Sequence, residues 1–266
     1  MTNKVLWTPD PERAKASTMA QFMRWLAAER GLHFDDYNDM WRWSVADLEA
    51  FWDAIWHFFA MRSFTPHERV LGARTMPGAE WFPGATVNYA DQMLAGADAR
   101  GDRAAVIVQS ETFGRHELSW SGLRDQVASV AARFRALGVT KGDRVVAILP
   151  NTETALIGCL AATSLGAIWS LCAPDMGHVA IIDRFRQIEP KLVIAQNRYV
   201  HAGKMTDRSA VIAEILDNLP TVENVVQVTV KDDLVAGRID WNDLLNDTVA
   251  FEPVPVAFDH PLWIVY

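Results

Sequence analysis

The sequence has 266 residues, of which 50% are hydrophobic and 22% are charged, and its formal net charge is −8. This apolar content is enough for one large core or two modest domains. The acidic balance excludes a general nucleic-acid-binding surface, which needs clustered Lys and Arg, although it leaves room for a local basic pocket that holds one phosphate. We therefore expect a globular protein with no nucleic-acid partner.

The sequence contains no visible targeting or membrane segment. Residues 1–4 read Met-Thr-Asn-Lys, and the chain reaches Asp10 without an apolar run, so we expect no signal peptide. The most apolar stretch, residues 155–172, is interrupted by polar and small residues such as Thr163 and Gly166. This pattern predicts a helix followed by a strand rather than a membrane span. The sequence thus favours a cytoplasmic protein with no membrane partner.

The first 85 residues form a tryptophan-rich region, since seven of the eleven tryptophans fall between Trp7 and Trp81. Ser17 is predicted to cap a helix. Ser44 and Asp47 resemble a capping pair that opens a second helix. The wide apolar stripe of that second helix consists of Val45, Leu48, Phe51, Trp52, Ile55, Trp56 and Phe59. Because such stripes are usually core, we predict that residues 1–85 form a helical layer packed on the main domain.

From residue 86 onward, short β-branched runs alternate with helical patterns. Expected strands cover residues 104–108, 118–120, 144–149, 167–171, 191–195 and 224–228, and expected helices cover residues 121–137, 152–165, 179–188 and 207–219. Gly138 is a typical helix stop. This alternation predicts an α/β fold in which helices flank a parallel sheet on both faces. Residues 86–266 are therefore expected to form one α/β subdomain.

The last thirty residues contain three further segments. Residues 239–245 are predicted to form a short helix or turn, and residues 251–261 a proline-punctuated connector. Residues 262–266, Leu-Trp-Ile-Val-Tyr, are typical of a buried apolar strand. Because natural domains seldom finish on the last residue of such a strand, we expect a truncated chain. Its open sheet edge would then pair with a missing C-terminal portion or with a second copy.

The common catalytic motifs are absent from the sequence. It contains no G-x-x-x-x-G-K-[ST], G-x-S-x-G or H-E-x-x-H, no metal-spaced Cys/His cluster, and no G-x-G-x-x-G after a strand. Cys159 and Cys172 lie in apolar segments and are expected to be buried, reduced thiols. We therefore expect no catalytic residue and no metal ligand in this chain.

Ligands of parallel α/β sheets bind in the loops beyond the carboxyl ends of the strands. Two such loops are predicted, at residues 172–177 and at residues 197–204. The second carries Arg198, His201 and Lys204 around a small Ala-Gly pair. Small residues let the backbone approach a ligand, and Lys supplies a point charge for a phosphate. An ordinary solvated loop is the alternative, and spacing alone favours it.

Several stretches resemble the acyl-adenylate-forming enzymes. Residues 134–145 read Phe-Arg-Ala-Leu-Gly-Val-Thr-Lys-Gly-Asp-Arg-Val and resemble the family signature L-x-x-x-G-V-x-x-G-D-R-V. Residues 149–151 and 161–167 continue that signature in register. Other stretches are similar to acetoacetyl-CoA synthetases in particular, namely residues 6–9, 81–90, 166–170, 172–175 and 183–191. The resemblance covers essentially the whole chain.

This resemblance implies a two-step ligase reaction and the first part of the family's large domain. A carboxylate attacks the α-phosphate of ATP to give an acyl-adenylate and pyrophosphate, and the thiol of CoA then displaces AMP. Mg²⁺ and fixed donors stabilise the phosphate charge. The acyl substrate implied is acetoacetate. In the family, the phosphate loop, the acyl pocket and a small C-terminal domain with a catalytic lysine follow the strand that resembles residues 263–266, so we expect the chain alone to be inactive.

The same resemblance implies a CoA site on the two predicted loops. The loop at residues 200–204 would hold the 3′-phosphate of CoA, and the loop at residues 173–175 would border its adenine. The expected cofactor-binding residues are Ala173, Pro174, Asp175, His201, Gly203 and Lys204. The family carries two arginines where this chain has His201 and Lys204, and glycines where it has Pro174 and Asp175. Asp175 would repel a phosphate placed near it.

Three alternative interpretations remain at this point. The chain would be a non-catalytic module that binds CoA or a partner protein through its open sheet edge. It would be part of a ligase for another short acid, such as acetate or propionate. It would be an unrelated α/β nucleotide-binding protein, which the missing glycine fingerprint disfavours.

Overall fold

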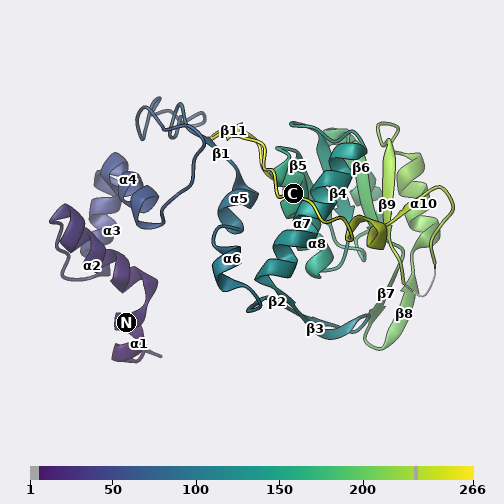
Figure 1. The fold of residues 1–266 in the computed structure, drawn as a ribbon, viewed down its shortest axis with the longest axis horizontal. Helices are drawn as coiled ribbons and strands as arrows, with labels where there is room; N and C mark the ends of the chain where they lie inside the picture. Colours follow the sequence, from purple (N-terminus) through teal and green to yellow (C-terminus); the bar gives the residue numbers. More distant parts are fainter. Residues whose placement is uncertain (1–5, 231–232) are drawn as a thin grey trace, which may run out of the picture. The chain divides into compact units, whose positions relative to one another are not determined.

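The computed structural model describes residues 6–230 and 233–266. Residues 1–4, on which the expectation of no signal peptide partly rests, lie outside the described residues. The chain divides into two compact units, residues 1–85 and residues 86–266, whose elements are labelled in Figure 1. Within the described part of the chain, no helix is both long and apolar enough to cross a membrane.

Four helices build the first unit over residues 6–85. They are α1 (Pro11–Ala16), α2 (Thr18–Arg30), α3 (Tyr37–Ala46) and α4 (Leu48–Phe58). The predicted cap at Ser17 is confirmed, since its hydroxyl accepts the Ala20 N–H at 3.2 Å. Asp10 and Asp36 cap α1 and α3 in the same way, through short-range bonds to backbone N–H groups. Neither α1 nor α3 was predicted.

The prediction that Ser44 and Asp47 together cap the helix with the apolar stripe is wrong for Ser44. Ser44 lies inside α3, and its hydroxyl donates to the Trp41 carbonyl at 2.8 Å. Asp47 alone caps α4, by accepting the Ala50 N–H at 3.0 Å. The apolar stripe is therefore divided between two helices, because the non-helical backbone at Asp47 separates them.

The core of the first unit lies between α2, α3 and α4. Phe22, Leu26, Met40 and Ala54 are buried, and aromatic rings pack around them. The ring centroids of Phe22 and Phe58 are 5.0 Å apart. Other members of the predicted stripe leave this core, since Trp52 is 39% exposed and Phe59 is 49% exposed. The packing of this unit on the main domain remains a prediction.

The second unit is built on the parallel sheet that the sequence predicts. Its strands lie in the order β10-β9-β6-β4-β5, and each neighbouring pair is parallel. The bounds are β4 (Arg144–Ile148), β5 (Ile168–Cys172), β6 (Leu192–Gln196), β9 (Asn224–Val228) and β10 (Ile239–Asp240). The segment predicted as a short helix or turn at residues 239–245 contributes both β10 and a 3₁₀ helix, Trp241–Leu244.

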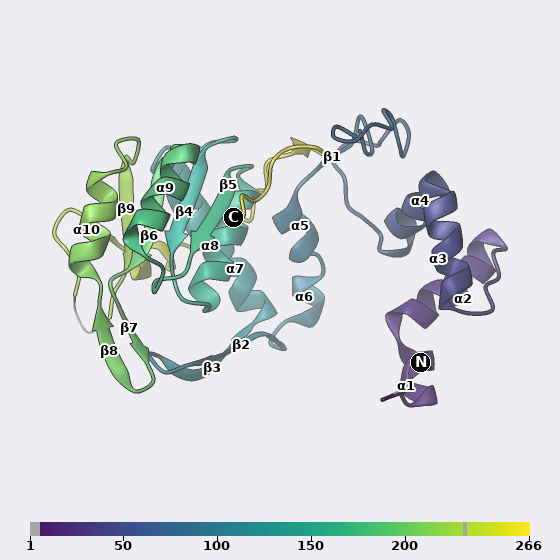
Figure 2. The same cartoon turned by 180° about the vertical axis from the view of Figure 1, so that it is seen from behind.

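Helices cover both faces of this sheet, as predicted. Figure 1 shows α7 (Trp120–Ala136) and α8 (Glu153–Ser164) in front of it, and Figure 2 shows α9 (His178–Ile188) on the other side, where α10 (Ser209–Asp217) also packs. Side chains alternate along each strand. In β4, Val145 and Ala147 join the core under α7 and α8, whereas Val146 and Ile148 join the core under α9 and α10.

Smaller elements surround the sheet. Two antiparallel hairpins pair β2 (Ala104–Ser110) with β3 (Gly114–Ser119) and β7 (Arg198–His201) with β8 (Lys204–Asp207). The remaining elements are β1 (Thr86–Val87), paired with β11 (Val256–Ala257), and the short helices α5 (Tyr89–Met93) and α6 (Ala97–Arg100). Trp120 was predicted to end a strand, but it begins α7 because Ser119 caps that helix.

The two cysteines are free thiols, as predicted, but they differ in burial. Cys172 is buried in the core, whereas Cys159 is only half-buried, so the expectation of two buried thiols is wrong for Cys159. Burial on the inner side of α8 still raises the pKa of the Cys159 thiol to about 11. A thiol with so high a pKa is protonated at neutral pH and unreactive.

The segment at residues 262–266 lies at the edge of the sheet beside β5, but it is not the buried strand that was expected. It forms a single parallel bridge, in which the Trp169 N–H donates to the Leu262 carbonyl at 3.1 Å and the Ile264 N–H donates to the Trp169 carbonyl at 2.9 Å. Trp263 is 57% exposed and Val265 is 70% exposed. Alternate side chains of this segment are therefore exposed, whereas those of Leu262 and Ile264 are partly buried.

Candidate functional site

The strand order places a topological switch point in the sheet. β5 lies on one side of β4, and β6, β9 and β10 follow on the other side. The connection through α8 therefore runs to one side of β4, and the later connections run to the other. Ligands of open α/β sheets bind at the carboxyl ends of the strands where the order reverses in this way. In this chain that place lies between the ends of β4 and β6.

Buried polar atoms without a hydrogen-bond partner gather at this switch point. Thr152 Oγ1 and Glu153 Oε2 follow β4, and Gln196 Oε1 and Asn197 Nδ2 lie at the end of β6. Buried polar atoms in folded proteins nearly always have a partner, so atoms left open here point to the functional end of the sheet. The sequence reasoning missed these residues, although a Gln-Asn pair directly after an apolar strand was a usable signal.

The first predicted loop follows β5. Ala173 and Asp175 are exposed, whereas Pro174 is buried. The loop is tied down by Arg208, whose guanidinium donates to the Met176 carbonyl at 2.9 Å. The backbone N–H of the same arginine donates to the Asn197 carbonyl at 2.8 Å. Arg208 therefore links the loop after β5 to the chain segment after β6.

The second predicted loop, at residues 197–204, is instead most of a β-hairpin. Residues 198–201 and 204–207 form β7 and β8, and Ala202 and Gly203 make the turn. Both turn residues have positive φ, of 51° and 72°, as two-residue hairpin turns of the primed type require. His201, Gly203 and Lys204 are exposed at the tip.

Arg198 is not available to a phosphate, contrary to what its place in the predicted loop implied. Its guanidinium Nε pairs with Asp207 Oδ2 at 2.8 Å, across the base of the hairpin. The Ser209 hydroxyl and N–H, together with Arg198, lower the pKa of the Asp207 carboxyl to about 2. Asp207 is therefore a firmly ionised partner that holds Arg198 in place.

The turn amides of the hairpin bind a carboxylate that the sequence reasoning missed. Glu111, in the turn between β2 and β3, accepts the Gly203 N–H at 2.7 Å and the Ala202 N–H at 3.2 Å. These two bonds are the main reason why the pKa of the Glu111 carboxyl lies below its usual value, and the nearby His201 lowers it further. No local pattern could reveal a partner ninety residues away.

Beneath the hairpin lies a polar network that sets its position. Arg238 donates from Nη1 to Asn197 Oδ1 at 2.9 Å and to Gln227 Oε1 at 3.3 Å. Asn197 and Gln227 are completely buried. Burial lowers the pKa of the Arg238 guanidinium, and the charge of Asp233 opposes that effect. The network joins the ends of β6 and β9 on the side of β6 that faces away from β4.

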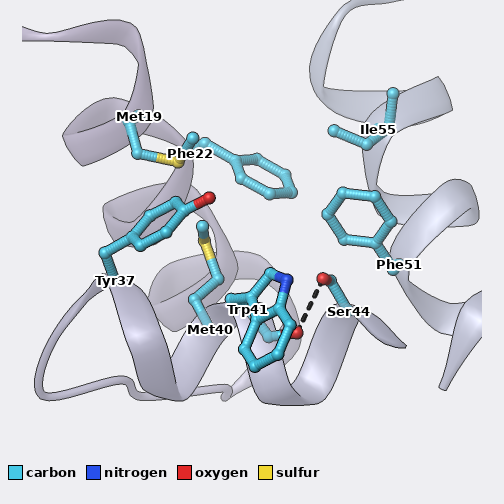
Figure 3. A pocket seen from close by; sticks show the side chains of 8 residues that line it. All are labelled: Met19, Phe22, Tyr37, Met40, Trp41, Ser44, Phe51 and Ile55. Atoms are coloured by element: carbon cyan, nitrogen blue, oxygen red, sulfur yellow. Dashed lines mark hydrogen bonds between the residues drawn. The ribbon is translucent and has the colours of Figure 1, made fainter. Parts of the chain in front are cut away.

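The first unit contains a separate apolar pocket of about 120 Å³ between α2, α3 and α4. Figure 3 shows Met19, Tyr37 and Trp41 on the side of α2 and α3, facing Phe51 and Ile55 of α4. Its lining contains no charged residue, and the Ser44 hydroxyl is taken by the Trp41 carbonyl. Ligand pockets usually exceed 300 Å³ and carry convergent polar groups, so this pocket does not suit a phosphate or a carboxylic acid.

The described residues do not provide a metal centre. Among residues 6–230 and 233–266, no group of three or more His, Cys, Asp and Glu side chains could hold a metal ion. The groups that this end of the sheet offers to a ligand are hydrogen-bond donors and acceptors and the lysine charge at the hairpin tip.

Comparisons with known proteins cover the whole chain. The sequence model of the AMP-binding enzyme family matches residues 95–266, and that of the acetyl-coenzyme A synthetase N-terminus matches residues 37–93. The acetoacetyl-CoA synthetase of Macaca fascicularis is 34% identical over 99% of this chain and 41% of its own length. The acetoacetyl-coenzyme A synthetase of Rhizobium meliloti is 33% identical over 98% of this chain and 41% of its own length.

A solved structure gives the same result. The acetoacetyl-CoA synthetase from Streptomyces lividans matches with a TM-score of 0.95 and 41% identity, covering 99% of this chain and 41% of that chain. This chain thus spans about 41% of the length of the relatives it matches. The chain belongs to the AMP-binding enzyme family, in which acetoacetyl-CoA synthetases match it along nearly its whole length.

Proposed function

We propose that this chain is the N-terminal part of an acetoacetate–CoA ligase, which converts ATP, acetoacetate and CoA to acetoacetyl-CoA, AMP and pyrophosphate. The observation that carries the proposal is the agreement with the Streptomyces lividans acetoacetyl-CoA synthetase over almost every residue of the chain. A shared fold alone supports many reactions, but identity of this level along the whole chain supports a shared reaction.

The proposed chemistry has two steps. A carboxylate oxygen of acetoacetate forms a bond to the α-phosphorus of ATP, and the bond to pyrophosphate breaks. The sulfur of CoA then bonds to the carbonyl carbon of the acyl-adenylate, and AMP leaves. Mg²⁺ would neutralise charge on the phosphates of ATP. Among the described residues, no cluster of side chains fits this ion. We therefore assign no metal-dependent step to the side chains of this chain.

The contribution of this chain is to bind CoA. His201, Gly203 and Lys204 would meet the 3′-phosphate at the hairpin tip, where backbone N–H groups and one lysine charge converge. Ala173, Pro174 and Asp175 would border the adenine, with the exposed Ala173 and Asp175 nearer to it than the buried Pro174. In this proposal the protein works in the cytoplasm, and its partners are small molecules.

The chain alone is proposed to be inactive, because the remaining three-fifths of its relatives' length would supply the phosphate loop and the acyl pocket. The experiment is acyl-CoA formation by the chain extended to the length of its relatives, with acetoacetate, acetate and propionate compared. Formation of acetoacetyl-CoA at the highest kcat/KM supports the proposal. A preference for acetate or propionate would replace the substrate, and no reaction with any acid would favour a non-catalytic module that binds CoA or a partner.

A further inference from the structure

Two hairpins of the second unit meet at their turns. The β2–β3 turn touches the β7–β8 hairpin through Glu111, and through Thr112 Oγ1, which accepts the Val200 N–H at 3.0 Å. Both views show the turn end of the β2–β3 hairpin beside β7 and β8 (Figures 1 and 2). The hairpin tip is therefore not an open surface, although every residue of its turn is exposed.

The turn at Ala202 and Gly203 is built to bind an anion. Two successive residues with positive φ point their N–H groups to the same side, and such concave backbone arrangements bind anions. Each oxygen of Glu111 takes one of these N–H groups, at 3.2 Å and 2.7 Å. The Glu111 carboxylate thus occupies an anion-binding seat, formed by the Ala202 and Gly203 N–H groups. These donors would also suit one phosphate group.

A phosphate and Glu111 cannot use this seat together. An N–H group donates one strong hydrogen bond, and two anions at contact distance repel each other. His201 and Lys204 flank the seat, and the Lys204 ammonium supplies positive charge to whichever anion sits there. A phosphate can therefore bind at this tip only by replacing the Glu111 carboxylate.

We propose that Glu111 is a displaceable internal anion that competes with the 3′-phosphate of CoA for the Ala202 and Gly203 amides, and so sets the preference of this protein for CoA over 3′-dephospho-CoA. The inference rests on the proposed CoA-binding function of the hairpin tip. Glu111 acts as a specificity-determining residue, because only the ligand with a 3′-phosphate has to remove it.

The test compares Glu111→Gln with the unchanged chain by calorimetric titration with CoA and with 3′-dephospho-CoA. Gln removes the charge and keeps the length of the side chain. We expect CoA to bind about fivefold more tightly to the variant, and 3′-dephospho-CoA to bind equally to both, since only the charge at an exposed and screened site changes. The Gly203 amide resonance should move on adding CoA and stay in place on adding 3′-dephospho-CoA.

Glu117→Gln is the matched control. It makes the same change of charge in the same hairpin, but Glu117 pairs with Arg115 at 2.6 Å and is not bonded to the turn amides. It should leave both affinities unchanged. Equal effects of the two variants, weaker CoA binding by Glu111→Gln, or no CoA binding by any of the chains would each overturn the inference.

The outcome is separable from the ligase proposal. Acetoacetate-dependent exchange between ATP and pyrophosphate by the chain extended to the length of its relatives needs no CoA, so it stays intact if the inference about Glu111 fails. Absence of exchange would instead contradict the ligase proposal. The measured effect of Glu111→Gln on CoA binding would still stand.

Discussion

The contacts of Asn88 explain most clearly why one of the family-like stretches, residues 81–90, has its sequence. It is 2% exposed, and its side-chain amide lies within hydrogen-bond distance of three carbonyl oxygens, those of Thr163, Ser164 and Val254. Its Oδ1 also accepts the Asp91 N–H and caps α5. One side chain therefore joins the end of α8, the start of α5 and the connector before β11.

We expect Asn88→Asp to destabilise the chain by roughly 2–4 kcal/mol at pH 7, because a carboxylate would face three carbonyl oxygens that lose their donor. Asn88→Ala should cost a similar amount, since it removes the same donor and also the cap. The measurement is the urea midpoint of each variant.

Lowering the pH distinguishes the two substitutions. The Asp variant should regain stability between pH 7 and pH 5, as its buried carboxyl takes up a proton, whereas the Ala variant should not. Asn246→Asp, at an exposed position, is the control and should leave the midpoint unchanged. An Asp variant as stable as the unchanged chain at pH 7 would contradict the role given to Asn88.

Asp207 makes the base of the hairpin dependent on pH. Its folded pKa of about 2 lies below the ordinary value of 3.8, because Ser209 and Arg198 bind the ionised form. A carboxyl whose pKa is lowered by folding stabilises the fold above its unfolded pKa and loses that effect as the pH falls. The stabilisation should therefore be complete above about pH 4 and disappear towards pH 2.

A carbon-13 titration of the Asp207 carboxyl measures this directly. We expect a midpoint near 2, and we expect Arg198→Gln to move it upward by removing the guanidinium. A midpoint at the ordinary value, unchanged by Arg198→Gln, would show that the ion pair does not form in solution.

At the scale of elements, the regular part of the second unit could be predicted from sequence because each strand is a short apolar run with its own boundaries. β4 and β6 are buried on both faces, so their runs are continuous. Gly138, which follows the C-cap of α7, has the positive φ that favours glycine. Local sequence and tertiary packing require the same conformation in these elements.

The β7–β8 hairpin could not be predicted in this way. Each strand has four residues, and neither is apolar enough to indicate a buried face. The hairpin is held by contacts from far along the chain, those of Glu111 and Thr112 at its tip. The first unit shows the same limit, since the cap at Asp47 divides an apolar stripe that looked like one helix.

The candidate site was predicted in part for the same reason. The carboxyl ends of the strands are where ligands bind in any parallel sheet, so the loops at residues 172–177 and 197–204 could be singled out before the fold was known. The narrower ranges 173–175 and 200–204 came from the resemblance to the family. The anion already seated on the turn amides, and the polar network of Asn197, Gln227 and Arg238, depend on tertiary contacts. Sequence periodicity carries no record of such contacts.

At the scale of the whole molecule, the edge beside β5 is open within the described residues, and Val265 is 70% exposed there. Exposed strand edges pair with other chains. We expect the isolated chain to self-associate at micromolar concentrations, as measured by sedimentation velocity, and Val265→Lys to reduce that association by placing a charge at the edge.

Val179→Lys is the matched control for this prediction. Val179 is 59% exposed on α9, away from the edge, so the same substitution there should leave association unchanged. Association that survives Val265→Lys, or that Val179→Lys abolishes equally, would show that the sheet edge is not the contact.

The central claim is that this chain is the first part of an acetoacetate–CoA ligase, and one measurement tests it most directly. Acetoacetate-dependent exchange between ATP and pyrophosphate is measured on the chain alone and on the chain extended to the length of its relatives. We expect exchange by the extended protein only. Exchange by the chain alone would contradict its proposed inactivity, and exchange by neither would contradict the assignment as an acetoacetate ligase.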